Sequence, residues 1–140
     1  MTVHPYLNFD GQAEEAFNFY RSVFGGEFTA NMKMTDAPGS EGLPEAEKNR
    51  TMHISLPIGK ETILMASDIL LSAGHKLVNG NNLYISLSPD TREEADRLFN
   101  GLSKDGEIEM PMEDQFWGDY FGSFTDRFGI RWMVNCPGQQ

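Results

Sequence analysis

The sequence predicts an α+β fold made of two similar βαβββ modules, about residues 1–68 and 82–136, whose curved mixed sheets enclose a cavity. Short apolar runs of strand length recur along the chain and end at glycine, proline, asparagine or aspartate. Each half also contains one helical pattern with a single apolar stripe, placed directly after its first strand. The order of elements in the first half then repeats in the second. The 140 residues are the usual size of one domain, so we expect a single domain over residues 1–140.

The first module begins with a predicted strand over residues 3–9, which ends at Asp10-Gly11. The helix that follows carries its apolar stripe on Ala13, Ala16, Phe17, Tyr20 and Phe24. Gly25-Gly26 supplies a stop after it. The remaining elements are a strand over 27–35, a surface loop over 36–50 and a hairpin of strands 51–58 and 61–67.

The second module follows a glycine- and asparagine-rich loop over residues 70–82. A strand over 83–88 leads to a helix that Asp90 or Thr91 caps. The apolar stripe of this helix consists of Ala95, Leu98, Phe99 and Leu102. A strand over 107–112 and a closing hairpin of strands 120–125 and 130–136 complete the module.

The two halves can also be aligned by residue. An offset of 79 places Glu14-Glu15-Ala16 on Glu93-Glu94-Ala95, and an offset of 80 places Gly26-Glu27 on Gly106-Glu107. Two amphipathic helices share some apolar positions by chance, so the matching strand order is what strengthens the case for a duplication.

The charge and composition exclude several classes of protein. The net charge of −10 repels phosphate backbones and anionic membranes, so we expect neither a nucleic-acid partner nor a membrane partner. No segment has the length of apolar sequence that spans a bilayer. The single cysteine, Cys136, cannot form an internal disulfide, and residues 1–20 do not resemble a signal peptide. We therefore expect a cytoplasmic protein.

Three segments carry a resemblance to a known family: PYLNFDGQAEEAFNFYRSVFGGEF at 5–28, ISLPIGKETILMASD at 54–68 and FWGDYFGSFTDRFGIRWMVN at 116–135. The chain resembles the PhnB-like group of the glyoxalase/bleomycin-resistance/dioxygenase superfamily, the vicinal oxygen chelate proteins. This resemblance implies a homodimer that binds a small molecule. Members are also labelled 3-demethylubiquinone methyltransferase-like, but the chain lacks a Gly-rich turn between a strand and a helix, so we expect no nucleotide or S-adenosylmethionine cofactor.

The resemblance also implies where a metal would lie. Metal enzymes of the superfamily place His, Gln or Glu ligands on the first and last strands of each half. To within one residue, the corresponding positions are His4, Met65, Leu83 and Met133. Thioether and alkyl side chains are poor ligands for the harder divalent ions. His53, Asp68 and Asp126 do not have the spacing of a displaced site either, so we predict no catalytic metal.

The predicted ligand-binding residues are Tyr6, Asn8, His53, Met65, Trp117, Tyr120 and Met133. Strand alternation puts Tyr6, Asn8 and His53 on one polar side, where His53 acts as a general base, contacts a ligand or is simply a satisfied histidine. Trp117 and Tyr120 lie in an aromatic loop that lines the cavity, packs across a dimer interface or, as the alternative, packs within the chain. The methionines form either an adaptable pocket or core filling.

The sequence therefore predicts a small-molecule-binding protein without a catalytic metal. The main alternative is a metal-dependent or His-based lyase, isomerase or dioxygenase that acts on a small organic substrate. A third is a purely structural dimer or interaction module, which a cavity too small for any ligand would favour.

Overall fold

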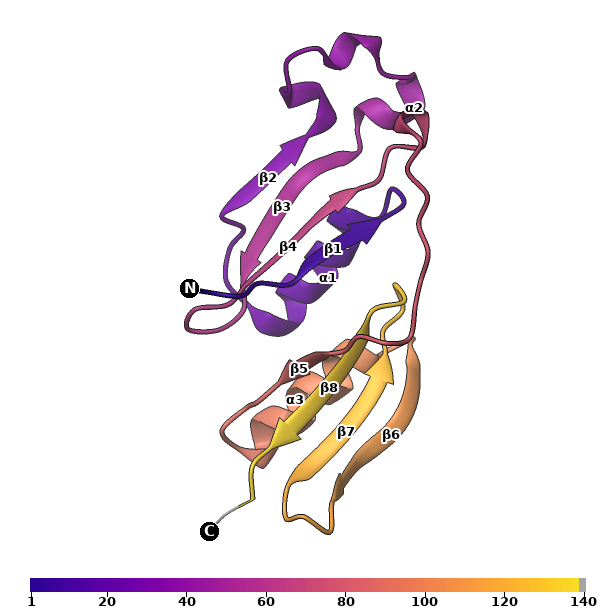
Figure 1. Ribbon diagram of the computed structural model, residues 1–140. Coiled ribbons are helices and arrows are strands. Elements are labelled where there is room, and N and C mark those ends of the chain that lie inside the picture. Colours follow the sequence, from indigo (N-terminus) through magenta and orange to yellow (C-terminus); the bar gives the residue numbers. More distant parts are fainter. Residues whose placement is uncertain (139–140) are drawn as a thin grey trace. The chain divides into compact units, whose positions relative to one another are not determined.

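The computed structural model describes residues 1–138 (Figure 1). The chain forms two compact units, Met1–Val78 and a second that begins at Asn79. The predicted modules fall inside these units, and the packing of both into one domain stays a prediction.

The first unit is a four-stranded mixed sheet with one long helix. Its elements are β1 (Tyr6–Phe9), α1 (Ala13–Phe24), β2 (Ala30–Lys33), β3 (Thr51–Pro57) and β4 (Ile63–Asp68). The strand order is β1-β4-β3-β2, in which β1 runs parallel to β4 and the other pairs are antiparallel. The predicted βαβββ order is confirmed.

The second unit has the same arrangement. Its elements are β5 (Ile85–Leu87), α3 (Arg92–Ser103), β6 (Glu107–Asp114), β7 (Tyr120–Thr125) and β8 (Arg131–Cys136). The order β5-β8-β7-β6 again contains one parallel pair, β5 with β8. Neither sheet is closed, because each ends in two unpaired edge strands.

The two long helices are related by the predicted offset of 79, since α1 spans 13–24 and α3 spans 92–103. Their N-termini are held differently. The Thr91 side chain accepts a hydrogen bond from the Glu94 backbone N–H, as the sequence predicts. Helix α1 has no side-chain cap from Gln12, and the Asp68 carboxylate instead accepts from the N–H of Ala13.

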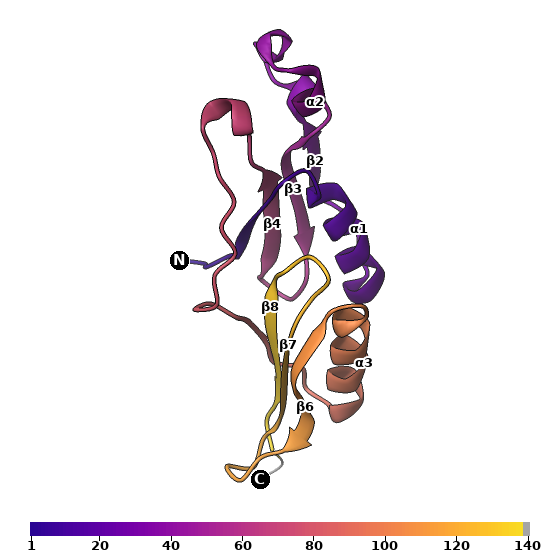
Figure 2. The same ribbon diagram turned by 90° about the vertical axis from the view of Figure 1, so that its right-hand side faces the viewer.

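Each helix covers one face of the sheet in its own unit (Figure 2). Residues of α1 that include Phe17 and Tyr20 are fully buried with Ile54, Leu56 and Leu64 of the sheet. In the second unit, the buried residues include Phe99 and Leu102 of α3 with Phe124, Trp132 and Val134. Burial of these apolar faces against the sheets is the main stabilising contribution in each unit.

Several predicted boundaries differ from those observed. The strand expected over 27–35 is short because Met34–Asp36 forms a 3-10 turn, in which the Asp36 carboxylate accepts from the Lys33 backbone N–H. The loop expected over 36–50 contains a second 3-10 turn, Ser40–Gly42, and the short helix α2 (Glu45–Lys48). The loop before β5 contains a third, Leu71–Ala73. Within residues 1–138, no helix is long and apolar enough to cross a membrane.

Candidate functional site

Each sheet has a face that its own helix does not cover. We call these faces the open face of the first sheet and the open face of the second sheet. Strand alternation assigns side chains to them, because residues i and i+2 share a face and paired residues point the same way. Polar and adaptable apolar side chains gather on both.

The open face of the first sheet brings together four of the predicted ligand-binding residues. Tyr6 pairs with Met65, and Asn8 lies two residues further along β1. His53 is on the same face of β3, where its Nδ1 lies 3.3 Å from the Tyr6 hydroxyl and the two rings are 5.8 Å apart. Asn8 accepts a hydrogen bond from the Ser67 hydroxyl at 3.4 Å. The alternation that grouped these residues is therefore seen in the structure, while their role in binding stays a prediction.

The positions that would hold a metal in related enzymes do not fit a hard divalent ion. The Nδ1 atom of His4 accepts a hydrogen bond from the Ile63 backbone N–H at 3.0 Å, so this lone pair is occupied. Met65 and Met133 offer only thioethers, and Leu83 lies before β5 with 76% of its surface exposed. In the part of the chain that the structure describes, no three His, Cys, Asp or Glu side chains gather as a metal site.

The open face of the second sheet carries a polar network that the sequence did not reveal. Glu109 of β6 accepts hydrogen bonds from the Tyr84 hydroxyl at 2.7 Å and from the Ser123 hydroxyl at 3.1 Å. The Nη1 atom of Arg131 donates to the Tyr84 oxygen at 2.7 Å and lies 3.5 Å from Glu109. Met133, a predicted binding residue, shares this face through its pairing with Ser123 and Ser86.

This network shifts the pKa values of Glu109 and Tyr84. The hydrogen bond from Tyr84, supported by Ser123 and Arg131, lowers the pKa of Glu109 below its usual range. The same bond to Glu109 raises the pKa of Tyr84. At neutral pH the pair is therefore a carboxylate and a neutral phenol, so Glu109 is a poor proton acceptor.

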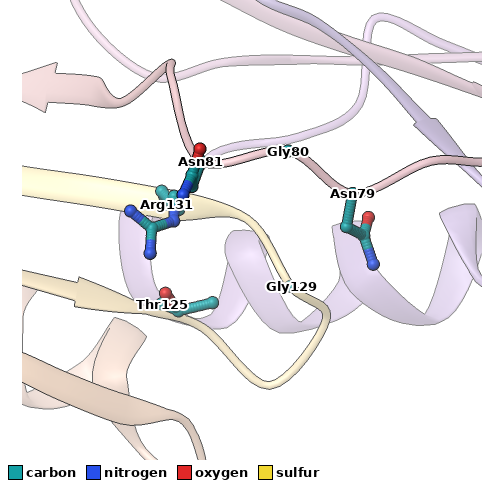
Figure 3. Close-up of a pocket in the computed structure, with 6 residues that line it drawn as sticks. All are labelled: Asn79, Gly80, Asn81, Thr125, Gly129 and Arg131. Carbon is teal, nitrogen blue, oxygen red and sulfur yellow. The ribbon is translucent and has the colours of Figure 1, made fainter.

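A pocket of about 470 Å³ is lined by Arg131 of this network. Figure 3 shows the residues that line it. Six residues line it: Asn79, Gly80, Asn81, Thr125, Gly129 and Arg131. All belong to the second unit. Its volume is within the range of small-molecule sites, but the pocket is open to solvent and lined mainly by polar groups.

The predicted aromatic residues divide between two environments. Trp117 lies in the turn between β6 and β7, half exposed, with its ring 5.1 Å from Phe116 and 6.1 Å from Phe121. Tyr120 faces the other way, toward α3. Its hydroxyl lies 2.6 Å from Asp96, and this bond raises the pKa of Tyr120. The structure therefore does not bring Tyr120 to the open face on which Met133 lies.

One sequence signal points to the position of Glu109, but not to the rest of the network. The offset of 80 that relates Gly26-Glu27 to Gly106-Glu107 also relates Thr29 to Glu109. The Thr29 hydroxyl contacts Ser55 at 2.7 Å in the first sheet, as Glu109 contacts Ser123 in the second. Tyr84 and Arg131 become visible only once the strand registers are known.

Two βαβββ units with open mixed sheets define this protein as an α+β protein of the duplicated βαβββ class. Its sequence matches the family model described as "Glyoxalase/Bleomycin resistance protein/Dioxygenase superfamily" over residues 2–134. The chain belongs to this superfamily.

Individual relatives are similar over nearly their full length. The protein YjdN of Escherichia coli (strain K12) is 31% identical, with 100% of this chain and 98% of YjdN covered. The crystal structure of PA1353 from Pseudomonas aeruginosa is 39% identical, with 99% of each chain covered and a TM-score of 0.86. A Bacillus cereus protein described as "Putative 3-demethylubiquinone-9 3-methyltransferase, PhnB protein" is 25% identical, with 97% of this chain and 99% of that chain covered and a TM-score of 0.75. The predicted resemblance to PhnB-like proteins is thereby confirmed.

Proposed function

We propose that this protein is a PhnB-like small-molecule-binding member of the superfamily that uses no catalytic metal. The observation that carries the proposal is the open face of the second sheet, where a pocket of about 470 Å³ adjoins the Tyr84, Glu109 and Arg131 network. Convergent polar groups beside a pocket are the usual sign of a ligand site. Met133 lies next to this network, and Tyr6, Asn8, His53 and Met65 provide a comparable set on the first sheet.

The experiment is native mass spectrometry of the protein purified without added ligand, together with elemental analysis for metals. We expect a co-purified organic compound and metal far below one equivalent per chain. The proposal is wrong if the protein carries near-stoichiometric zinc, nickel, manganese or iron that His4→Ala removes. His75→Ala is the matched control, because His75 is exposed and its Nδ1 also accepts a backbone hydrogen bond.

A second candidate is a metal-free acid–base catalyst, and the contact between Tyr6 and His53 favours it. A histidine with one nitrogen held by a phenol is suited to move a proton between ligand atoms. If His53 catalyses an isomerisation, incubating the co-purified compound with the protein in D₂O will incorporate deuterium at a carbon next to a carbonyl. His53→Gln will abolish the incorporation, whereas His75→Gln will not.

We also propose a cytoplasmic homodimer in which the exposed aromatic turn contributes to the interface. Phe116 is 99% exposed and Trp117 is 51% exposed, which is unusual for large apolar side chains. Cys136 is a buried free thiol, and a reduced cysteine of this kind is consistent with the cytoplasm.

A further inference from the structure

The two open faces can be compared position by position because both sheets have the same pairing. Met65 pairs with Ser55 in the first sheet, and Met133 pairs with Ser123 in the second. Counting along the strands from these pairs gives three further equivalences. They match His4 with Tyr84, Thr29 with Glu109, and Ile63 with Arg131.

The comparison shows that the two faces differ in charge at equivalent positions. Thr29 and Ile63 of the first sheet have neither a carboxylate nor a guanidinium. The second sheet has both, in Glu109 and Arg131, and these are connected through the Tyr84 hydroxyl. Among the residues that the structure describes, an ion pair therefore lies on only one of the two open faces.

Within this ion pair, both the Tyr84 and Ser123 hydroxyls donate to the Glu109 carboxylate, whereas only part of the Arg131 guanidinium has a partner. The Glu109 carboxylate accepts from Tyr84 and Ser123 and faces Arg131. A guanidinium has five N–H donors. Among residues 1–138, the polar contacts of Arg131 involve Nη1 alone, so the donors on Nε and Nη2 remain available.

The pocket beside Arg131 has the matching chemistry. Its six lining residues include one cation and no acidic side chain, although the chain has a net charge of −10. Asn79, Asn81 and Thr125 add amide and hydroxyl groups, which have no side-chain hydrogen bond in the described part of the chain. Figure 3 shows Arg131, Asn81 and Thr125 together at this site. Glu107 pairs with Thr125 across the strands, but it is exposed and does not line the pocket.

We propose that this pocket binds the carboxylate group of a small organic acid, with Arg131 as the residue that determines specificity. Arg131 is anchored by Tyr84 and Glu109 on one side, so its remaining N–H donors are held ready for a planar oxygen acceptor. The inference rests on the proposed function, since it names the class of ligand for the same site.

The test is an NMR titration of the full-length protein with benzoate and with benzamide, its neutral analogue. Benzoate is expected to shift the Arg131 side-chain N–H signals and the Asn79 and Asn81 amide signals saturably. Benzamide is expected to bind at least tenfold more weakly, because it lacks the charge that Arg131 pairs with. A parallel titration with inorganic phosphate distinguishes a preference for phosphoryl groups from a preference for carboxylates.

Four variants make the test specific. Arg131→Gln and Asn81→Asp are each expected to weaken benzoate binding about tenfold. Asn81 is exposed, so the second variant should fold even if the first does not. Arg92→Gln is the matched control, because Arg92 is an arginine of the same unit that pairs with Asp114 away from the pocket. Glu107→Gln should tighten binding slightly by removing a nearby negative charge.

The outcomes separate this inference from the proposed function. Equal binding of benzoate and benzamide overturns the carboxylate assignment but leaves small-molecule binding intact. Tighter binding of phosphate than of benzoate overturns it in favour of a phosphoryl ligand. If none of the three probes shifts these signals, the inference is wrong, and the proposed function then depends on the mass-spectrometric result alone.

Discussion

Asp68 and Asp126 are buried carboxylates that hold the backbone of their own units. Asp68 accepts hydrogen bonds from the backbone N–H groups of Gly11, Ala13 and Thr51 at 2.8–3.0 Å. Asp126 accepts from two backbone N–H groups in its turn and from the Trp132 indole. Their lone pairs are therefore already used within the fold. This is the physical reason why neither aspartate is suited to the displaced metal site considered from the sequence.

Replacing Asp68 tests this role. Asp68→Ala leaves three buried or partly buried N–H groups without their acceptor, so we expect the free energy of unfolding to fall by about 3 kcal/mol. Urea denaturation followed by circular dichroism measures this loss. Glu61→Ala, at an exposed position of the adjoining hairpin, should change stability by less than about 0.5 kcal/mol. A loss below about 1 kcal/mol for Asp68→Ala would show that the three bonds are replaced by others.

The lowered pKa of Glu109 predicts how the stability of the protein depends on pH. Its folded-state pKa is lowered, first of all by the Tyr84 hydroxyl, so its contribution to stability is fully present above the unfolded value of about 4.3 and is lost as the pH falls through the folded value. A ¹³C NMR titration of the Glu109 carboxyl should give a pKa below the ordinary range. In Tyr84→Phe this pKa should rise toward that range. An unchanged pKa in the variant would mean that Tyr84 is not the main cause.

At the scale of elements, the second sheet accommodates its helix through a glycine. Gly122 on β7 pairs with Val134, as Ile54 on β3 pairs with Ala66, so glycine replaces isoleucine at equivalent positions. A Cβ atom on Gly122 would lie 2.8 Å from the Phe99 ring of α3 and 3.0 Å from the Met110 backbone oxygen. Helix α3 can therefore approach its sheet only because this side chain is absent.

The added methyl group in Gly122→Ala should therefore push both α3 and β6 away from β7. We expect a loss of about 1–3 kcal/mol of stability, the usual cost of overpacking a core. The measurement is the urea midpoint and the denaturant slope. Gly59→Ala is the control, because the nearest atom to its Cβ is 4.0 Å away. Equal stability of the two variants would contradict the close packing of α3.

The elements themselves were largely predictable, and the side-chain network was not. The stripe from Ala13 to Phe24 predicts α1 because helix periodicity is a local property of the sequence. Tyr84 and Glu109 are 25 residues apart; Tyr84 directly precedes the edge strand β5, and Glu109 lies on the opposite edge strand β6. Their contact depends on a register shift in β6 between Ile108 and Met110, which no local pattern specifies. The same register explains why Tyr84, and not Leu83, belongs to the open face.

At the scale of the whole molecule, the exposed turn and the net charge of −10 act in opposite directions. Like charge on every copy opposes association, while large exposed apolar side chains favour it. Phe116 and Trp117 stack edge to face at 5.1 Å, so they present one apolar surface in a chain that otherwise repels its copies. We therefore expect copies of the chain to associate through this turn, and we expect the association to become tighter as the salt concentration rises.

The exposed aromatic turn predicts the oligomeric state. We expect light scattering to give twice the mass of the chain, and the dimer to become tighter as salt screens the repulsion between copies. Phe116→Ser combined with Trp117→Ser should shift the protein toward monomer by at least tenfold in dissociation constant, because about 25 cal/mol is lost per Å² of apolar surface that stays exposed. Val3→Ser is the control, since Val3 is 79% exposed and lies outside the turn. A monomeric native protein would contradict this prediction. So would a double variant with the same dimer dissociation constant as Val3→Ser. In either case the aromatic turn would be available to contact a ligand.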